Sequence, residues 1–352
     1  MDRIPSSPPN IPARAAVENR PLWSVMIPVY NCARYLPDTL ESVLEQDLGE
    51  ERMQIEVIDD ASTDDDVEKM VRELGKGRVG YYRQAHNVGS LRNFETCINR
   101  ANGQFVHLLH GDDRVKNGFY KKLSALFYIY PEAGAACCNY DFIDESGGVS
   151  HSNQMEATQE GILENWLARI AERQRLQYVA VAVRREVYEV LGSFYGATYG
   201  EDWEMWTRIA KYYPIAYTPQ VLAQYRQHND SITSGKILSG EIYSDLTFVI
   251  NQISHHLPKA SRDRIAKRSR FDLALFMLGM AYKSWEDSRC YSSIRIYLRQ
   301  ILKLSKHPKV ICHIINIYYK VLSDLLRKVS INDFSKTYLA KKTRSYQNDG
   351  RR

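Results

Sequence analysis

Two pairs of adjacent aspartates stand where apolar runs of this 352-residue chain end. Asp59–Asp60 close one such run, and Asp112–Asp113 follow shortly after another. Carboxylate oxygens are the ligands that hard divalent cations such as Mg²⁺ and Mn²⁺ prefer. Ligands of open α/β sheets bind at the carboxyl ends of the strands. The two pairs therefore predict a nucleotide site with a divalent cation.

A third acidic pair and one histidine add to this chemistry. Glu201 and Asp202 begin a stretch with the apolar spacing of a helix. Acidic residues in a first turn favour the helix dipole, and a carboxylate can equally serve as a general base. His228, in the sequence YRQHNDS, could complete a metal shell beside a carboxylate or lie in a loop without a role. The residues alone leave these alternatives open.

Alternating strand and helix patterns position these residues. This alternation is typical of βαβ units and a parallel sheet. Beyond residue 237 the chain has only helical patterns. The expected strands are 23–29, 54–59, 78–83, 105–109, 135–140, 178–183 and 221–225. The expected helices are 37–46, 65–74, 91–101, 118–130, 162–171, 186–191, 203–212, 242–257, 264–283, 291–304 and 310–329.

The order and spacing of six motifs resemble the family-2 inverting glycosyltransferases of GT-A fold. The motifs are VMIPVYN, IEVIDDASTD, NVGSLRN, LLHGDD, GEDWEMWTRIA and YRQHNDS, and the resemblance covers roughly residues 21–234. It implies an α/β fold with a Rossmann-like, mostly parallel central sheet flanked by helices, and the helical patterns beyond residue 237 add an all-helical module. It also implies transfer of one sugar from a nucleotide-diphosphate sugar, UDP by default, to an acceptor hydroxyl with inversion, assisted by Mg²⁺ or Mn²⁺.

The resemblance assigns roles to individual residues. Asp202 would be the catalytic base, supported by Glu201, and Asp113 with His228 would bind the metal. His110 departs from the pattern, because many relatives have Asp there, and we expect His107 and His110 to serve packing or to support the ligands. Asp60 is left for the base because Thr63 or Asp64 is the better cap for the next helix. The residues expected to bind the donor are Pro28, Tyr30, Asn31, Asp60, Asn87, Arg92 and Asp112.

Charge and composition divide the chain. Residues 241–352 carry 22 Lys and Arg against 9 Asp and Glu, or +13, whereas the whole chain is +5. We expect a flexible arm (1–20), a GT-A domain (21–235) and a basic helical module (236–352). The basic module would contact an anionic membrane surface or a phosphate-bearing acceptor, or else be a solvated face.

Cysteine usage and hydropathy bear on location. The six cysteines have no metal-ligand spacing, which favours buried reduced thiols and a reducing cytoplasm. No apolar run approaches the roughly 20 residues that span a bilayer. The expected location is the cytoplasm, with peripheral contact at the inner face of the membrane. The acceptor would be a glycan or glycolipid of bacterial-type surface polysaccharide assembly, no nucleic-acid partner is expected, and a homo-oligomer is left open.

Missing motifs argue against several other classes of protein. Without GxGxxG or GxxxxGK[ST], a nicotinamide dehydrogenase and a P-loop NTPase are disfavoured. A nucleotidyltransferase would need glycines after the first strand, and VYNCARYLP has none. The absent QxxRW motif favours a non-processive hexosyltransferase over a processive synthase. The alternative from another class is a catalytically silent GT-A scaffold that binds nucleotide and acts through its helical module.

Overall fold

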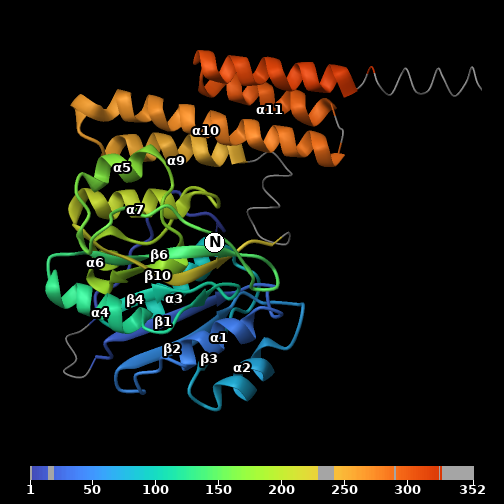
Figure 1. The fold of residues 1–352 in the computed structure, drawn as a ribbon. Coiled ribbons are helices and arrows are strands. Elements are labelled where there is room, and N and C mark those ends of the chain that lie inside the picture. Colours follow the sequence, from blue (N-terminus) through green and yellow to red (C-terminus); the bar gives the residue numbers. More distant parts are fainter. Residues whose placement is uncertain (1, 15–19, 229–241, 289–290, 325, 327–352) are drawn as a thin grey trace, which may run out of the picture. The chain divides into compact units, whose positions relative to one another are not determined.

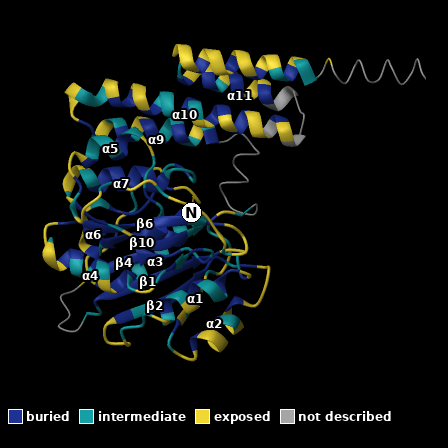
Figure 2. Ribbon diagram, in the orientation of Figure 1, coloured by how far each residue is buried: buried dark blue, intermediate teal, exposed yellow. Residues whose placement is uncertain are grey.

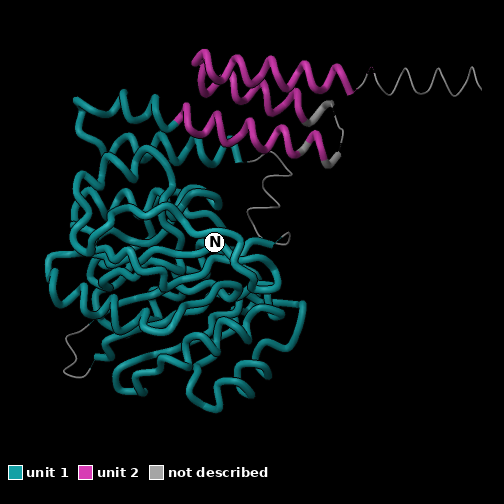
Figure 3. Tube along the Cα trace, in the orientation of Figure 1, with its two compact units in different colours: residues 1–269 teal, residues 270–352 magenta. Residues whose placement is uncertain are grey.

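The computed structural model describes residues 2–14, 20–228, 242–288, 291–324 and 326. The chain divides into two compact units, Met1–Ser269 and Arg270–Arg352 (Figure 3). The sequence places the domain boundary at 235/236, which lies outside the described residues and stays a prediction.

A sheet of ten strands, counted over the described residues, forms the centre of the first unit (Figure 1). The main strand order is β3-β2-β1-β4-β9-β6-β10-β5. The pairs β3–β2, β2–β1, β1–β4 and β6–β10 are parallel, and β9 joins the two parallel groups in antiparallel fashion. The predicted fold class is confirmed. The strands are β1 (Trp23–Val29), β2 (Met53–Asp59), β3 (Gly80–Arg83), β4 (Phe105–Leu108), β5 (Arg114–Val115), β6 (Ala135–Ile143), β7 (Val149–Ser152), β8 (Gly161–Ile162), β9 (Val181–Arg184) and β10 (Ile215–Arg226).

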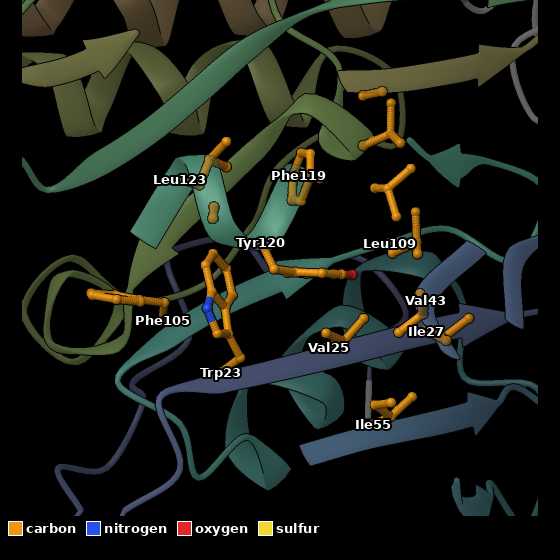
Figure 4. Packing of buried hydrophobic residues seen from close by; sticks show 14 of the residues in the cluster. Trp23, Val25, Ile27, Val43, Ile55, Phe105, Leu109, Phe119, Tyr120 and Leu123 are labelled. Carbon is orange, nitrogen blue, oxygen red and sulfur yellow. The ribbon is translucent and has the colours of Figure 1, made fainter. Parts of the chain in front are cut away.

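The core lies between the sheet and the helices that cover it (Figure 2). Alternate residues of β1 face a cluster that includes apolar side chains of α1, α2 and α4. In Figure 4, Trp23 lies beside Phe105 and Tyr120, with ring centroids 5.4 and 5.1 Å away. Helix α3 packs on β1, β2 and β4 through residues outside this cluster. The helices of this unit up to β10 are α1 (Leu36–Leu44), α2 (Val67–Gly75), α3 (Ser90–Arg100), α4 (Phe119–Ile129), α5 (Trp166–Glu172), α6 (Arg185–Leu191) and α7 (Glu201–Tyr212), with a 3₁₀ turn at Tyr178–Ala180.

Strand β10 is longer than the sequence predicts. It begins at Ile215, whereas the apolar pattern indicates a strand only over 221–225. Its register against β6 shifts between Thr218 and Val221, and again before Ala223. Pro219, which has no N–H for the ladder, lies in this irregular stretch and divides the strand into two short apolar runs.

Segment 2–14 packs on the rest of the first unit. The Pro5 and Pro9 carbonyls accept hydrogen bonds from Gly196 N (2.8 Å) and Ser193 N (2.9 Å). Ile11 is 1% exposed. The expected flexible arm covers residues 1–20, and its described part is tied down because these contacts bury apolar surface and pair backbone groups.

The remaining described helices are α9 (Ile242–His256), α10 (Lys259–Ser288), α11 (Tyr291–Leu304) and residues 308–324. α9 packs on α7 within the first unit. In the second unit, Trp285 Nε1 donates to Asp324 Oδ2 (2.9 Å), and Ile294, Leu298 and Ile301 are buried. Among the helices that the structure describes, none combines the length and apolar character of a membrane span.

Candidate active site

The first aspartate pair divides into two different environments at the end of β2. The Asp59 side chain is fully buried, accepts from Ser62 N (2.8 Å) and Tyr81 Oη (2.8 Å), and is paired with Arg83. Asp60 instead accepts from the backbone N–H groups of Val88 (2.7 Å) and Gly89 (2.9 Å). Burial raises the pKa of Asp60, although these two N–H groups and the charge of Arg3 oppose the shift. Asp59 thus clamps the strand end, and Asp60 holds the turn before α3.

Neither aspartate of this pair caps the next helix. The cap of α2 is Asp66, whose Oδ1 accepts from Lys69 N (3.0 Å). The expected cap residues, Thr63 and Asp64, are wrong in detail, because Asp64 Oδ2 accepts from Ala33 N (2.9 Å) and binds the turn after β1 instead. The inference that Asp60 is not needed as a cap is retained.

The residues after β1 lie next to Asp60. The backbone N–H of Asp60 donates to the carbonyl of Val29, the last residue of β1 (2.8 Å). Tyr30 follows and is 51% exposed, so its ring is open to a planar ligand. Asn31 has a φ of 49° and accepts from Thr63 N (2.8 Å), which joins the two strand ends. Pro28 is buried within the sheet, and its carbonyl accepts from Gly111 N (3.2 Å).

Asn87 and Arg92 lie around the start of α3. Asn87 Nδ2 donates to the Asp60 carbonyl (3.2 Å), so it belongs to the same turn. Arg92 contacts Glu95 through Nη1 (2.6 Å) and donates from Nε to the Asp2 carbonyl (2.9 Å). The predicted donor-binding residues on β1, β2 and α3 are therefore brought together at one edge of the sheet.

The second aspartate pair follows β4, and within the described part of the chain neither carboxylate forms a salt bridge with an arginine or a lysine. Asp113 is 1% exposed, and its Oδ1 accepts from Arg226 N (2.8 Å). Burial and the neighbouring Asp112 charge raise the pKa of Asp113 well above its ordinary value. Burial acts the same way on Asp112, but its hydrogen bond to His228 Nε2 (2.9 Å) and the nearby imidazoles outweigh it, so the pKa of Asp112 is lowered.

His110 joins this pair in a group that fits a divalent cation. Potential ligand atoms of His110, Asp112 and Asp113 all lie within 4.8 Å of one another. The Nε2 atom of His110 is buried and has no hydrogen-bond partner among the described residues. The two carboxylates suit Mn²⁺ or Mg²⁺, and an imidazole nitrogen without a partner is a further potential ligand for a divalent cation. The group differs from the predicted set, because His228 reaches the site through Asp112 and His110 supplies an unpaired ring nitrogen.

Glu201 and Asp202 begin α7, directly after Gly200, which has a φ of 85°. Asp202 is 8% exposed, accepts from Trp203 N (2.7 Å) and also accepts from Gln174 Nε2. Burial and the charge of Glu201 raise the pKa of Asp202 well above its ordinary value. A buried carboxylate with a raised pKa holds a proton more readily than an exposed one.

Tyr178 connects the two acidic regions. Its hydroxyl donates to Glu201 Oε1 (3.2 Å), and its ring lies 4.4 Å from that of His110. His110 also stacks on Phe94 of α3, with centroids 5.1 Å apart. The metal-compatible group, the start of α3 and the start of α7 are thus neighbours through one aromatic cluster.

Three residues of this site are missing from the sequence predictions. Arg226 is 2% exposed, donates to the Asp112 carbonyl (2.8 Å) and pairs with Asp38 (2.8 Å). Its place in YRQHNDS, two residues before His228, is a signal that could have found it. Gln174 and Tyr178 carry no such signal, because their roles depend on how α5 and the 3₁₀ turn are placed.

Comparison with known proteins shows which proteins the chain is similar to. The model of glycosyl transferase family 2 matches residues 24–192. An uncharacterized protein of Mycobacterium tuberculosis is 27% identical over 62% of this chain and 71% of its own length. The minor teichoic acid biosynthesis protein GgaB of Bacillus subtilis is 28% identical over 30% of this chain, which is 12% of GgaB.

Solved structures show the same fold. S. aureus TarS 1–349 in complex with UDP-GlcNAc has a TM-score of 0.61 at 16% identity, covering 87% of this chain and 92% of TarS 1–349. The mannosyltransferase PcManGT of Pyrobaculum calidifontis, in complex with GDP-Man and Mn²⁺, has a TM-score of 0.55 at 16% identity, covering 91% and 90%. These comparisons show a glycosyltransferase with a GT-A fold, and they support family 2, whose model matches residues 24–192.

Proposed function

We propose that this glycosyltransferase is metal-dependent and inverting, and moves one sugar per event from a nucleotide-diphosphate sugar to an acceptor hydroxyl. The observation that supports this most is the Tyr178 bridge between Glu201 and His110. It makes the proposed base and the proposed metal group neighbours, and direct displacement needs the acceptor and the leaving group to be held together.

The donor would lie along the edge formed by β1, β2 and α3. Tyr30 would stack on the base, Asp60 would accept from a base N–H, and Asp112 would bind the ribose. Pro28 and Asn31 would shape the nucleoside pocket through their backbone, since Pro28 is buried and the Asn31 side chain is engaged. Asn87 and Arg92 would contact the diphosphate, where a guanidinium gives charge-assisted hydrogen bonds.

Asp113 would hold a divalent cation, Mg²⁺ or Mn²⁺, together with Asp112 and His110, while His228 orients Asp112. Such a cation, when bound, neutralises the negative charge that collects on the departing diphosphate. The buried carboxylate of Asp113 gains from it as well, because a cation offsets the repulsion by Asp112 that raises its pKa.

Asp202 would act as the general base. It takes the proton from the acceptor hydroxyl as that oxygen attacks the anomeric carbon and the bond to the diphosphate breaks. Gln174 fixes one oxygen of Asp202 and Trp203 N fixes the other, so the carboxylate is oriented before the acceptor arrives. Glu201 supports the base through its charge, which raises the pKa of Asp202.

The test separates binding from turnover. UDP, GDP, dTDP and CMP would be screened by thermal shift with and without Mn²⁺, and the matching sugar nucleotides by release of the nucleotide. Asp202→Asn should keep the metal-dependent shift and lower the turnover by about 10²- to 10⁴-fold, the usual contribution of a general base. Glu164→Gln, at an exposed carboxylate, is the control.

The outcomes test the role of Asp202 and distinguish a glycosyltransferase from a catalytically silent scaffold. Turnover by Asp202→Asn equal to the control would remove Asp202 as the base. Nucleotide binding without turnover of any sugar nucleotide by the wild-type protein would favour the catalytically silent scaffold.

The acceptor is proposed to be a glycan or glycolipid of surface polysaccharide assembly, which GgaB, named for minor teichoic acid biosynthesis, supports by similarity. The exposed apolar residues Ile315, Tyr319 and Leu322 on the basic second unit support peripheral contact with an anionic membrane. The expected result is co-sedimentation with anionic but not neutral vesicles, reduced in Lys306→Glu/Lys309→Glu. Equal sedimentation with both would contradict the charge-based contact. A homo-oligomer remains a prediction.

A further inference from the structure

Segment 2–14 reaches the turn that holds Asp60. Arg3 donates from Nη2 to Oδ1 of Asn87, and its side chain lies along Gly89. The Arg3 Nε atom is 3.1 Å from the position that a Cβ on Gly89 would take. Gly89 has a φ of 89°, so this position favours glycine for its backbone and also leaves room for the guanidinium. Arg3 is therefore a neighbour of the residues proposed to hold the donor.

The segment is anchored, so the place of Arg3 follows from fixed backbone. Pro5 and Pro9 accept from the loop before α7, at Gly196 and Ser193. Ile11 is buried, and Arg185 Nη2 donates to the Pro12 carbonyl (3.2 Å). The Asp2 carbonyl accepts from Arg92 Nε (2.9 Å), so the same segment orients the arginine proposed to bind the diphosphate.

Asp60 and Arg3 together offer a hydrogen-bond acceptor beside a hydrogen-bond donor. Each oxygen of the Asp60 carboxylate, which is 2% exposed, accepts one backbone N–H, and these bonds use two of its about four lone-pair sites. The exposed guanidinium of Arg3 carries five N–H donors, one of which has a described bond to Asn87. An acceptor beside a donor matches a ring N–H beside a carbonyl, which uracil, thymine and guanine present. Cytosine presents a bare ring nitrogen beside an amino group, the opposite pattern.

We propose that Arg3 recognises the base carbonyl of the donor beside Asp60, which makes segment 2–14 part of the nucleotide site. The inference rests on the proposed role of Asp60 in base binding. It adds a specificity-determining residue outside the part of the chain that the family model matches.

Calorimetric titration in the presence of Mn²⁺ tests this. The probes are CDP and whichever of UDP, dTDP and GDP gives the largest thermal shift. Arg3→Ala should weaken binding of the preferred nucleotide about tenfold, the worth of one charge-assisted hydrogen bond, with little change for CDP. Arg72→Ala is the matched control, because it removes the same charge from an exposed pair on α2.

The variant Asp60→Asn separates the two proposals. If the wild-type protein binds none of the three nucleotides, or Asp60→Asn binds as well as wild type, the proposed donor site fails and this inference fails with it. If Asp60→Asn is weakened but Arg3→Ala matches Arg72→Ala, only the role of Arg3 is overturned. Equal losses for CDP and the preferred nucleotide would overturn base recognition. Tighter binding by Arg3→Ala would mean that the segment competes with the donor.

Discussion

The pairs Asp59–Asp60 and Asp112–Asp113 have the same residue types and similar places after strands, but their neighbours differ. Asp59 is paired with Arg83 and accepts from two further donors. Asp113 accepts one backbone N–H among the described contacts and lies beside a second carboxylate. Asp59 is neutralised by Arg83, whereas Asp112 is paired with His228 and Asp113 is the carboxylate for which we propose a bound cation. Paired carboxylates therefore have different roles according to which charges surround them.

The largest effect that would test this comparison is on the second pair. Asp113→Asn should lose the Mn²⁺-dependent binding of nucleotide and lower turnover by about 10³-fold, since a bound cation contributes several kcal/mol. The melting temperature without metal should stay the same or rise, because a buried like-charge contact is removed. Thermal shift with and without Mn²⁺ measures both. Asp65→Asn, at an exposed position, is the control, and a retained Mn²⁺ response would sink the assignment.

A substitution in the first pair should lower the stability of the fold. Asp59→Ala should lower the free energy of unfolding by about 3 kcal/mol, because Tyr81 Oη and Ser62 N lose their partner inside the protein. This loss of stability lies at the lower end of the range for broken buried ion pairs, because the Arg83 side chain is 44% exposed and can be solvated by water. Urea denaturation measures it. A loss no larger than that of Asp113→Asn would show that the two pairs do not differ in this way.

Tyr30 tests whether the nucleoside binds beside the first aspartate pair. Tyr30→Ala should weaken nucleotide binding about tenfold, because stacking on a base contributes about 1–3 kcal/mol. The loss should be the same with and without Mn²⁺, unlike that of Asp113→Asn. Tyr128→Ala, at a 68% exposed tyrosine of α4, controls for the loss of a surface ring. A loss confined to the metal-bound state would place Tyr30 near the diphosphate instead.

The smallest expected effect concerns the third pair, which also consists of neighbouring carboxylates. The charge of Glu201 raises the pKa of Asp202, after burial. A base with a raised pKa is protonated as the pH falls, so kcat/KM should decline on the acid side. Glu201→Gln removes the repulsion, lowers the pKa of Asp202 and should move that acid limb to lower pH. A profile measured from acid to neutral pH would contradict the assignment if the limb stayed in place or moved upward.

Much of the site could be predicted because its motifs follow strands whose apolar patterns can be read locally, and the carboxyl ends of parallel strands meet at one edge of the sheet. The predicted strands 23–29 and 54–59 match β1 and β2 to within a residue, and Asp60 and Tyr30 follow them at one edge of the sheet. Their neighbours could not be predicted with the same precision. Arg83 lies 24 residues from Asp59 and pairs with it because β3 runs parallel to β2 in register.

Sequence patterns do not identify residues that meet across long sequence distances. His110 carries no sign that its Nε2 is buried beside two carboxylates, and Gln174 carries none that it donates to Asp202. The sequence predicts one basic helical module from residue 236, and it does not indicate that α9 packs on α7 or that His256 pairs with Glu204 (2.9 Å). Helical periodicity shows which face is apolar but not which element covers it.

The sequence by itself determined the fold class, the family and the acidic pairs, because apolar periodicity and strand-end motifs are local properties of the chain. The tertiary structure decided which carboxylate of each pair is neutralised, which histidine nitrogen is left without a partner, and that Arg3 lies beside Asp60, 57 positions along the chain. Those outcomes depend on distances and burial between segments that are remote in sequence, and charge interactions are set by that surrounding rather than by residue type.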